Sequence, residues 1–266
     1  FIEDAEAAMY RIMNEDAPTD EETIKKFGIG LSIQKVSLTG YLKNKKYKKI
    51  IIILTGLAIL VSGIYFKQEF FLMIPLFVSL FVMSFQSEAN RIGSLIGAIN
   101  AVIYTAAYLY MGVYISAASS FFMSVPLQLA TFFNWKKNAY KKTVIFKKMS
   151  VKMRIISLVA LLVSWGISAG VLTYFKYEYA IFDTITFLLG LAVSVLTMLA
   201  YIEYTYLWIV SAVTGLIVNI QMVINNPKEI TYLIYGVYAL YCVVVAFINV
   251  QKFYKEQQNE KQMVEG

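Results

Sequence analysis

The 266-residue chain is too hydrophobic for a soluble globular protein: 59% of its residues are hydrophobic and 15% are charged, against about 45–50% and about 25% in soluble domains. It has one cysteine and no histidine, which excludes an intramolecular disulfide and every catalytic triad, zinc site or proton relay built on imidazole. The net charge of +7 is concentrated beside hydrophobic segments, a pattern that indicates membrane orientation and not nucleic-acid binding. The composition predicts a polytopic membrane protein with no nucleic acid as partner.

The N-terminal segment, residues 1–49, is acidic and then basic. Residues 1–24 hold eight acids and one base, whereas lysines cluster in Lys43–Lys49, directly before the first hydrophobic run. Lysines in that position favour a cytoplasmic N-terminus and contact with anionic lipid. The segment is compatible with a short amphipathic helix on the membrane surface or with disorder.

Eight hydrophobic runs follow, each close to the roughly 20 residues that a membrane-spanning helix needs. They cover residues 50–66, 70–85, 93–110, 113–134, 154–174, 181–200, 206–224 and 230–250. Because 93–134 is too long for one crossing, we expect a hairpin that turns at Gly112. The runs are continuous and do not alternate with period two, so a transmembrane barrel is not expected.

The distribution of charge agrees with eight spans. With a cytoplasmic N-terminus, the segments 1–49, 86–92, 135–153, 201–205 and 251–266 lie inside, and together with Arg154 they hold 21 of the 24 Lys and Arg residues. The outer connections hold only Lys67, Lys176 and Lys228. We therefore predict an all-α membrane protein with eight transmembrane helices, both termini in the cytoplasm and a short cytoplasmic tail at 256–266.

The two halves of the chain have similar sequences in the same order. The segment Tyr65–Phe70 (YFKQEF) recurs as Tyr174–Tyr179 (YFKYEY). The halves end with Phe133–Lys136 and Phe247–Lys252, and both of these segments contain an aromatic residue, an asparagine and a lysine. Chance and membrane composition are the alternative explanation for matches this short. Duplication predicts parallel repeats, a transporter architecture whose substrate site lies between the repeats near the membrane midplane.

Polar residues within the spans are candidates for that site. Gln128 follows Pro126 by two residues, and its amide suits a carboxamide or a sugar hydroxyl; a kink with a glutamine bonded to a neighbouring helix is the alternative. Asn100 and Asn219 occupy comparable places in the two halves, and hydrogen bonding between helices is the alternative for both.

Aromatic residues and one acid complete the candidates. Trp208 is a site residue or part of an interfacial aromatic belt, and Tyr235, Tyr238 and Tyr241 form a stripe on one helix face that suits either packing or stacking on a flat ring. Asp183 is the one acid well inside a predicted span and is a possible proton or gating site, or else a solvated residue at a helix start. Phosphate loops, paired carboxylates and metal-ligand clusters are absent from the sequence, so we expect neither an enzyme nor a cofactor.

Motifs in both halves of the chain carry a family resemblance. Phe121–Gln128 (FFMSVPLQ) with Phe132–Asn138 (FFNWKKN) resembles the Pro-x-Gln…Phe-x-x-Trp-Lys-Lys pattern of the PnuC vitamin transporters of Gram-positive bacteria. In the second half, Leu207–Ile209 and Tyr235–Tyr238 are similar to that family's Leu-Trp-Ile and Tyr-x-x-Tyr elements. The resemblance runs from about residue 50 to 255.

The resemblance implies a SWEET-like fold with a 1+3+1+3 arrangement of helices in a transporter domain at 50–255. Residues 50–66 would be an extra helix, 154–174 the linker, and 70–134 and 181–250 the triple-helix repeats. Members of the family carry nicotinamide riboside across the bacterial inner membrane by facilitated diffusion, and a cytoplasmic ribosylnicotinamide kinase traps it for NAD synthesis. Relatives carry thiamine, riboflavin or deoxynucleosides. A homo-oligomer is compatible with this family.

The resemblance also implies site residues. Gln128, Trp208, Tyr235 and Tyr238 match positions that line the family's substrate site, and Trp135 belongs to the matched Trp-Lys-Lys element. The chain departs from the family at Tyr204–Thr205, where many members have Asn-Trp, and at Ala212, where a polar residue is common. These departures leave a different vitamin as one alternative. A non-transporting membrane protein that interacts through its acidic segment, 1–24, is another.

Overall fold

The computed structural model describes residues 45–111, 114–175 and 180–265. The chain divides into two units, 1–38 and 39–266, and all described residues belong to the second. Its first half contains α4 (Lys45–Tyr65), α5 (Phe70–Ser87), α6 (Ile92–Tyr110), α7 (Tyr114–Ser119), the π-helical turn η1 (Ser120–Ser124) and α8 (Val125–Lys137). A hairpin of β1 (Ala139–Tyr140) and β2 (Thr143–Val144) leads to α9 (Val151–Tyr174), followed by α10 (Ala180–Met198), α11 (Tyr204–Asn225), the 3₁₀ turn η2 (Pro227–Glu229) and α12 (Ile230–Glu265).

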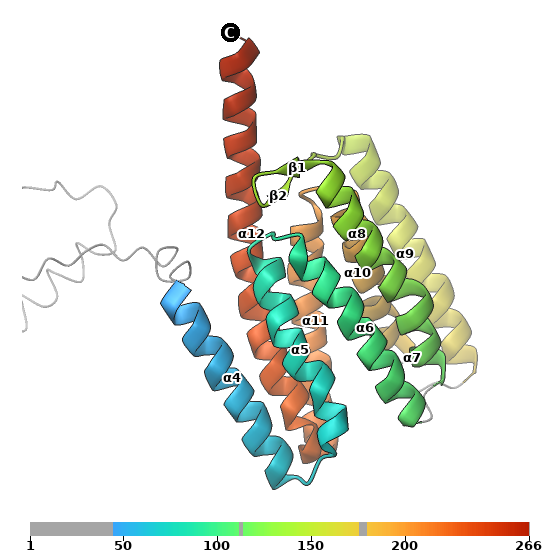
Figure 1. The fold of residues 1–266 in the computed structure, drawn as a ribbon. Coiled ribbons are helices and arrows are strands. Elements are labelled where there is room, and N and C mark those ends of the chain that lie inside the picture. The colour runs from blue at the N-terminus through green and yellow to red at the C-terminus, as the bar shows by residue number, and fades with distance from the viewer. Residues whose placement is uncertain (1–44, 112–113, 176–179, 266) are drawn as a thin grey trace, which may run out of the picture. The chain divides into compact units, whose positions relative to one another are not determined.

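Six of these helices form a closed ring (Figure 1). In order around the ring they are α5, α6, α8, α10, α11 and α12; each packs against the next, and α12 packs against α5. Helix α4 lies outside the ring against α5 and α12, and α9 lies outside it against α10. The ring therefore combines one set of helices from each half, and α9 connects the two sets.

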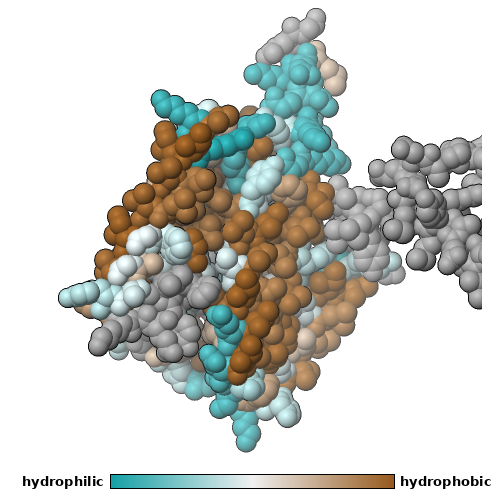
Figure 2. Space-filling model, turned by 180° about the vertical axis from the view of Figure 1, so that it is seen from behind, coloured by the Kyte–Doolittle hydropathy of each residue, from teal (hydrophilic) through white to brown (hydrophobic). Residues whose placement is uncertain are grey.

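The outer surface of the helices is hydrophobic. Large apolar side chains of α4 and α9, such as Leu54, Leu158 and Ile167, are more than half exposed, and in Figure 2 such groups cover much of the face, with hydrophilic groups at its upper edge and along the protruding helix end. Six helices of the described residues are long and apolar enough to cross a membrane, and Thr184–Met198 is a shorter apolar helix. The chain is thus a multi-pass membrane protein, while the count of eight spans stays a prediction.

The run at 113–134 contains a π-helical turn, Ser120–Ser124, just before Pro126. Proline has no N–H to donate to the carbonyl of Phe122, so the regular pattern of hydrogen bonds must change here. The turn supplies the change: the Val125 N–H bonds to the Ser120 carbonyl, five residues back. The expected hairpin turn at Gly112 lies outside the described residues.

The first helix that each half contributes to the ring, α5 or α10, ends in the same way. Helix α5 ends before Ala89 and α10 ends before Ala200, and both alanines adopt a left-handed conformation, with φ of 51° and 61°. Each alanine donates its N–H three residues back, to the carbonyls of Gln86 and Thr197 respectively. This geometry stops a helix but leaves some of its last carbonyls without a partner in the helix.

An asparagine from the opposite half caps each of these helix ends. Asn134 of α8 donates its Nδ2 to the carbonyl of Met198 at the end of α10. Asn249 of α12 donates its Nδ2 to the carbonyl of Ser87 at the end of α5, at 2.8 Å. The α8–α10 and α12–α5 junctions, which close the ring, therefore each include a hydrogen bond from an asparagine on the last helix of one half to the end of the first ring helix of the other.

A set of polar contacts gathers at the end of the ring that carries the hairpin. We call it the basic end, because the lysines of residues 136–152 and Arg154 lie there. Gln257 of α12 donates to the carbonyl of Val144 and accepts from the N–H of Phe146. Helix α12 continues past the hairpin beyond this contact (Figure 1). At the same end, Lys48 of α4 forms an ion pair of 3.2 Å with Glu88.

The asparagine caps give a prediction for stability. Asn134→Ala or Asn249→Ala would leave the carbonyl of Met198 or Ser87 without its side-chain donor. The loss of such a part-buried hydrogen bond costs about 0.5–1.5 kcal/mol. Each variant should lower the midpoint of thermal unfolding in detergent. Asn259→Ala, at an exposed position of α12, is the matched control and should leave the midpoint unchanged. Equal midpoints for all three variants would contradict a structural role of the caps.

Candidate functional site

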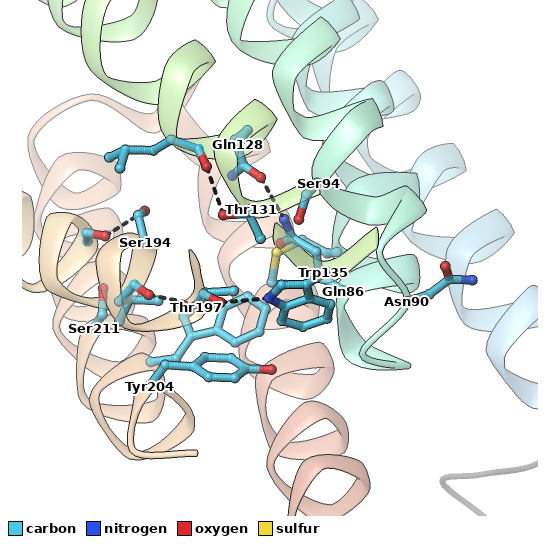
Figure 3. Close-up of a pocket in the computed structure, with 15 residues that line it drawn as sticks. Gln86, Asn90, Ser94, Gln128, Thr131, Trp135, Ser194, Thr197, Tyr204 and Ser211 are labelled. Carbon is cyan, nitrogen blue, oxygen red and sulfur yellow. Dashed lines mark hydrogen bonds between the residues drawn. The ribbon is translucent and has the colours of Figure 1, made fainter. Parts of the chain in front are cut away.

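A cavity of about 220 Å³ lies between the two halves, close to the basic end. Its walls come from α5, α6 and α8 on one side and α10 and α11 on the other (Figure 3). The residues that line it are Met83, Gln86, Asn90, Ser94, Leu127, Gln128, Thr131, Trp135, Gly190, Val193, Ser194, Thr197, Tyr204, Trp208 and Ser211. Its volume is below the roughly 300–1,000 Å³ of pockets for drug-sized ligands, so it suits a small metabolite.

Three aromatic side chains form one end of the cavity. Trp135 is 3% exposed and donates its indole N–H to the carbonyl of Thr197 at 2.7 Å. Tyr204 is 1% exposed, and its ring centroid lies 6.0 Å from that of Trp208. Trp135 and Tyr204 belong to one buried cluster, against which Trp208 packs, and their rings lie close together in Figure 3. This end therefore presents aromatic surface from both halves.

Two glutamines supply amide groups to the same cavity. Gln86 of α5 donates its Nε2 to the Oε1 of Gln128 on α8 at 3.5 Å, the long limit of a hydrogen bond. A Cβ at Gly97 would lie 3.0 Å from that Oε1, so glycine on α6 makes room for the Gln128 side chain. Because each amide has two donors and one acceptor oxygen, the pair retains hydrogen-bonding capacity for a ligand.

Hydroxyl groups line the remaining wall. Thr131, Ser194 and Thr197 each donate to a carbonyl one turn earlier in their own helix, at 2.7–2.9 Å. Their oxygens can still accept a hydrogen bond from a ligand. Among the described residues that line the cavity, none is charged. The cavity thus offers aromatic faces and neutral polar groups, and it excludes a site that depends on ionised side chains.

The structure brings three of the sequence-predicted site residues together. Gln128, Trp135 and Trp208 all line the cavity, whereas Asn100, Asn219, Tyr235 and Tyr238 do not. Asp183 lies in the first turn of α10, and its side chain lies outside the described residues. The predicted set is therefore divided between the cavity and positions elsewhere in the ring.

Asn100 belongs to a second polar group, between α5 and α6. It is 5% exposed and donates its Nδ2 to the Oγ of Ser79 at 2.8 Å, while its Oδ1 is buried without a hydrogen-bond partner. The hydroxyl of Tyr104 lies 3.4 Å from the same Ser79 Oγ. Tyr235 packs, partly buried, against the neighbouring apolar cluster.

Asn219 and Tyr238 make contacts between helices. Asn219 donates its Nδ2 to the carbonyl of Tyr232 at 3.1 Å and lies against Gly236, where an added Cβ would come within 2.6 Å of that nitrogen. Tyr238 is 3% exposed and donates its hydroxyl to the carbonyl of Leu80 at 2.8 Å. These contacts join α11 to α12 and α12 to α5.

Sequence reasoning missed several cavity residues. Gln86, Asn90 and Ser94 lie near the connection between α5 and α6, and Ser194, Thr197 and Ser211 lie inside long hydrophobic runs. Serine and threonine commonly bond to their own helix backbone, so nothing in the sequence separates those facing a cavity from those facing lipid. Tyr204 departs from the family pattern in sequence, but only the structure shows that it lines the cavity.

Comparison with known proteins gives two findings. The family model described as "Nicotinamide mononucleotide transporter" matches residues 69–251. A solved structure titled "Crystal structure of the Vitamin B3 transporter PnuC" is similar to this chain with a TM-score of 0.65 and 18% sequence identity, over 79% of this chain and 92% of that one. No curated protein matches.

The two findings support different conclusions. At 18% identity the structural likeness shows that the fold is shared. The family model covers more than half of the chain, including α5 to α11 and α12 up to residue 251, and it confirms the resemblance to PnuC. Helix α4 precedes the matched range. The chain therefore belongs to the nicotinamide mononucleotide transporter family, and it is a membrane transporter and not an enzyme.

Proposed function

We propose that the protein carries nicotinamide riboside across the bacterial inner membrane by facilitated diffusion, and that a cytoplasmic kinase traps the substrate for NAD synthesis. The observation that carries the proposal is the cavity between the halves, with an aromatic end formed by Trp135, Tyr204 and Trp208 and a wall of neutral polar groups. A nicotinamide ring attached to ribose is cationic, flat and rich in hydroxyl groups, which matches both parts of this lining.

The aromatic end suits the pyridinium ring. A cation over an aromatic face is stabilised by about 0.5–2 kcal/mol, and such a site needs no carboxylate. We assign the carboxamide to Gln86 and Gln128, which have donors and acceptors, and the ribose hydroxyls to Thr131 and Ser194. The inferred contacts combine both halves, so movement of one half against the other would open the site.

The lining favours a nucleoside over a nucleotide. A phosphate group buried without a cation pays a large desolvation cost, and phosphate sites in proteins ordinarily use arginine, lysine or backbone N–H groups. The described lining residues include no lysine or arginine. The uncharged lining therefore favours the riboside as cargo. The family description, in contrast, names the mononucleotide.

The two asparagine caps support parallel repeats. Each joins the last helix of one half to the first helix of the other with the same helix-end geometry, as expected if an axis along the membrane normal relates the halves. We place the basic end in the cytoplasm because lysines and arginines concentrate there. Both termini and the cavity then lie on the cytoplasmic side of an eight-helix transporter.

We assign no contact in the cavity to four of the residues that the sequence predicted for the site: Asn100, Asn219, Tyr235 and Tyr238. They lie outside the cavity in the ring that surrounds it, and we infer that Asn100, with its unpaired Oδ1, and Tyr235 contact the substrate during its passage. Thiamine, riboflavin or a deoxynucleoside is the alternative cargo, because Tyr204 occupies the cavity where many relatives have another residue. Membership of a transporter family disfavours a non-transporting interaction protein.

The first test is binding of nicotinamide riboside, thiamine, riboflavin and thymidine to the purified protein in detergent, measured by calorimetry. Nicotinamide riboside should bind best, and Trp208→Ala should weaken it about 2- to 30-fold through loss of the aromatic face. Trp165→Ala removes a tryptophan of α9 that does not line the cavity and should bind as the wild type does. Best binding of another vitamin would replace the substrate, and a well-folded sample that binds none of the four would contradict the transport proposal.

A second test compares nicotinamide riboside with its 5′-phosphate. Because the cavity lacks a cation among its described residues, nicotinamide mononucleotide should bind at least about tenfold more weakly, in keeping with the cost of burying an unpaired charge. Calorimetry under the same conditions measures both dissociation constants. Equal affinities would show that a cation outside the described lining reaches the phosphate.

The third test concerns facilitated diffusion. In proteoliposomes, uptake of labelled nicotinamide riboside should stop at equal concentrations inside and outside, with or without a proton gradient. Asp183→Asn should leave this uptake unchanged, because a uniporter needs no proton-carrying side chain. Accumulation driven by a proton gradient, lost in Asp183→Asn, would show that the carrier is proton-coupled.

A further inference from the structure

A groove of about 960 Å³ lies beside the contact between α9 and α10. It lies between one face of α9 and helices α10, α11 and α12, and it is distinct from the cavity between the halves, with which it shares no lining residue. Helices α9 to α11 lie at the back in Figure 1, and Figure 2 turns that mostly hydrophobic face of the molecule towards the viewer. The helices that line the groove therefore belong to a mostly hydrophobic outer face.

The long part of the groove is apolar. Leu158 and Leu161 of α9 line it together with Leu191 and Val195 of α10. The lining of α9 extends from Arg154 to Ser164, which is roughly 15 Å at the helical rise of about 1.5 Å per residue. That length is about half of the ~30 Å hydrocarbon core. The groove thus spans the depth of a single leaflet.

The other part of the groove, at the basic end, is cationic. Lys148, Arg154 and Lys255 line it, and Glu203 is the one acid among its described lining residues. Glu203 accepts from Arg154 at 2.7 Å and from the N–H of Met149 at 3.1 Å. Within the described residues Lys148 and Lys255 form no ion pair, and both are exposed. Two lysines are therefore free to bind an anion next to the partly neutralised arginine.

We propose that the groove binds one anionic phospholipid. Its phosphate lies against Lys148 and Lys255, with Arg154 beside them, and an acyl chain runs along Leu158, Leu161 and Val195. Basic pockets between membrane helices at the cytoplasmic side are sites for anionic headgroups. The cations lie at the end of the groove where a headgroup would be, and the apolar part extends towards the membrane centre, so the groove matches the lipid in charge and in depth.

The bound lipid would complete the packing of the linker helix. Among the described elements α9 makes its substantial helix contacts with α10, and the groove leaves the face of α9 towards α11 and α12 uncovered. Because α9 connects the two halves, a lipid in this position holds the linker against the second half. Lipid binding in the groove is independent of the cargo, since no cavity residue takes part.

The experiment measures lipid binding to the full-length protein purified in detergent. Native mass spectrometry and the midpoint of thermal unfolding are followed while dioleoylphosphatidylglycerol or dioleoylphosphatidylcholine is added. Phosphatidylglycerol should bind with an affinity on the order of tenfold higher and should raise the midpoint more, because each lysine near an anionic lipid adds attraction. The double variant Lys148→Gln/Lys255→Gln should lose this preference.

The matched control is Lys67→Gln/Lys228→Gln, which removes two exposed lysines at the opposite end of the bundle. It should keep the preference for phosphatidylglycerol. Equal binding of both lipids to the wild type, or an equal loss of preference in the two double variants, would overturn the proposal.

A second variant tests the groove itself. Leu161→Trp fills the apolar part and should lower the number of lipids that remain bound, while Leu162→Trp, at an exposed neighbouring position outside the groove, should not. Leu161→Cys tests for a second copy of the chain, since the native Cys242 is buried and does not compete for a cross-linker. Efficient cross-linking into dimers through position 161 would mean that a second copy covers the groove, and the lipid proposal would be wrong.

Discussion

The ring depends on the requirement that helix carbonyls inside a membrane protein find a donor. Water is scarce there, so an unpaired backbone carbonyl is costly. Helices α5 and α10 both end in a left-handed alanine, and Asn249 and Asn134 from the opposite halves donate to the carbonyls of Ser87 and Met198. The same type of hydrogen bond is therefore found at both junctions between the halves, where α8 meets α10 and α12 meets α5.

The cavity is a consequence of the same junction. Trp135 follows Asn134 and donates its indole N–H to Thr197, one residue before the carbonyl that Asn134 caps. Trp135 and Thr197 both line the cavity. A substrate that contacts both halves is therefore held beside the bonds that join them, which couples binding to any movement of one half against the other.

The sequence predicted the helices far better than the site. Long hydrophobic runs and Pro126 identify helices and their irregularities in the sequence. They do so because a helix that crosses a membrane needs a continuous apolar segment and a proline disturbs its hydrogen bonds. Gln128, Trp135 and Trp208 were identified through motifs and lie in the cavity, whereas Asn219 and Tyr238 lie in contacts between helices. A polar side chain within a hydrophobic run can line a cavity or bond to a neighbouring helix. Only the packing of the neighbouring helices distinguishes these two roles.

By itself the sequence determined the membrane class, the approximate helix boundaries, the family motifs and the similarity of the two halves, because hydropathy and short motifs are local properties. The tertiary structure decided which helices adjoin, that each asparagine caps a helix of the other half, and that Gln86, Ser194 and Tyr204 share a cavity. These facts depend on contacts between residues distant in the chain. Such contacts follow from the packing of the whole ring, and a local sequence pattern does not specify that packing.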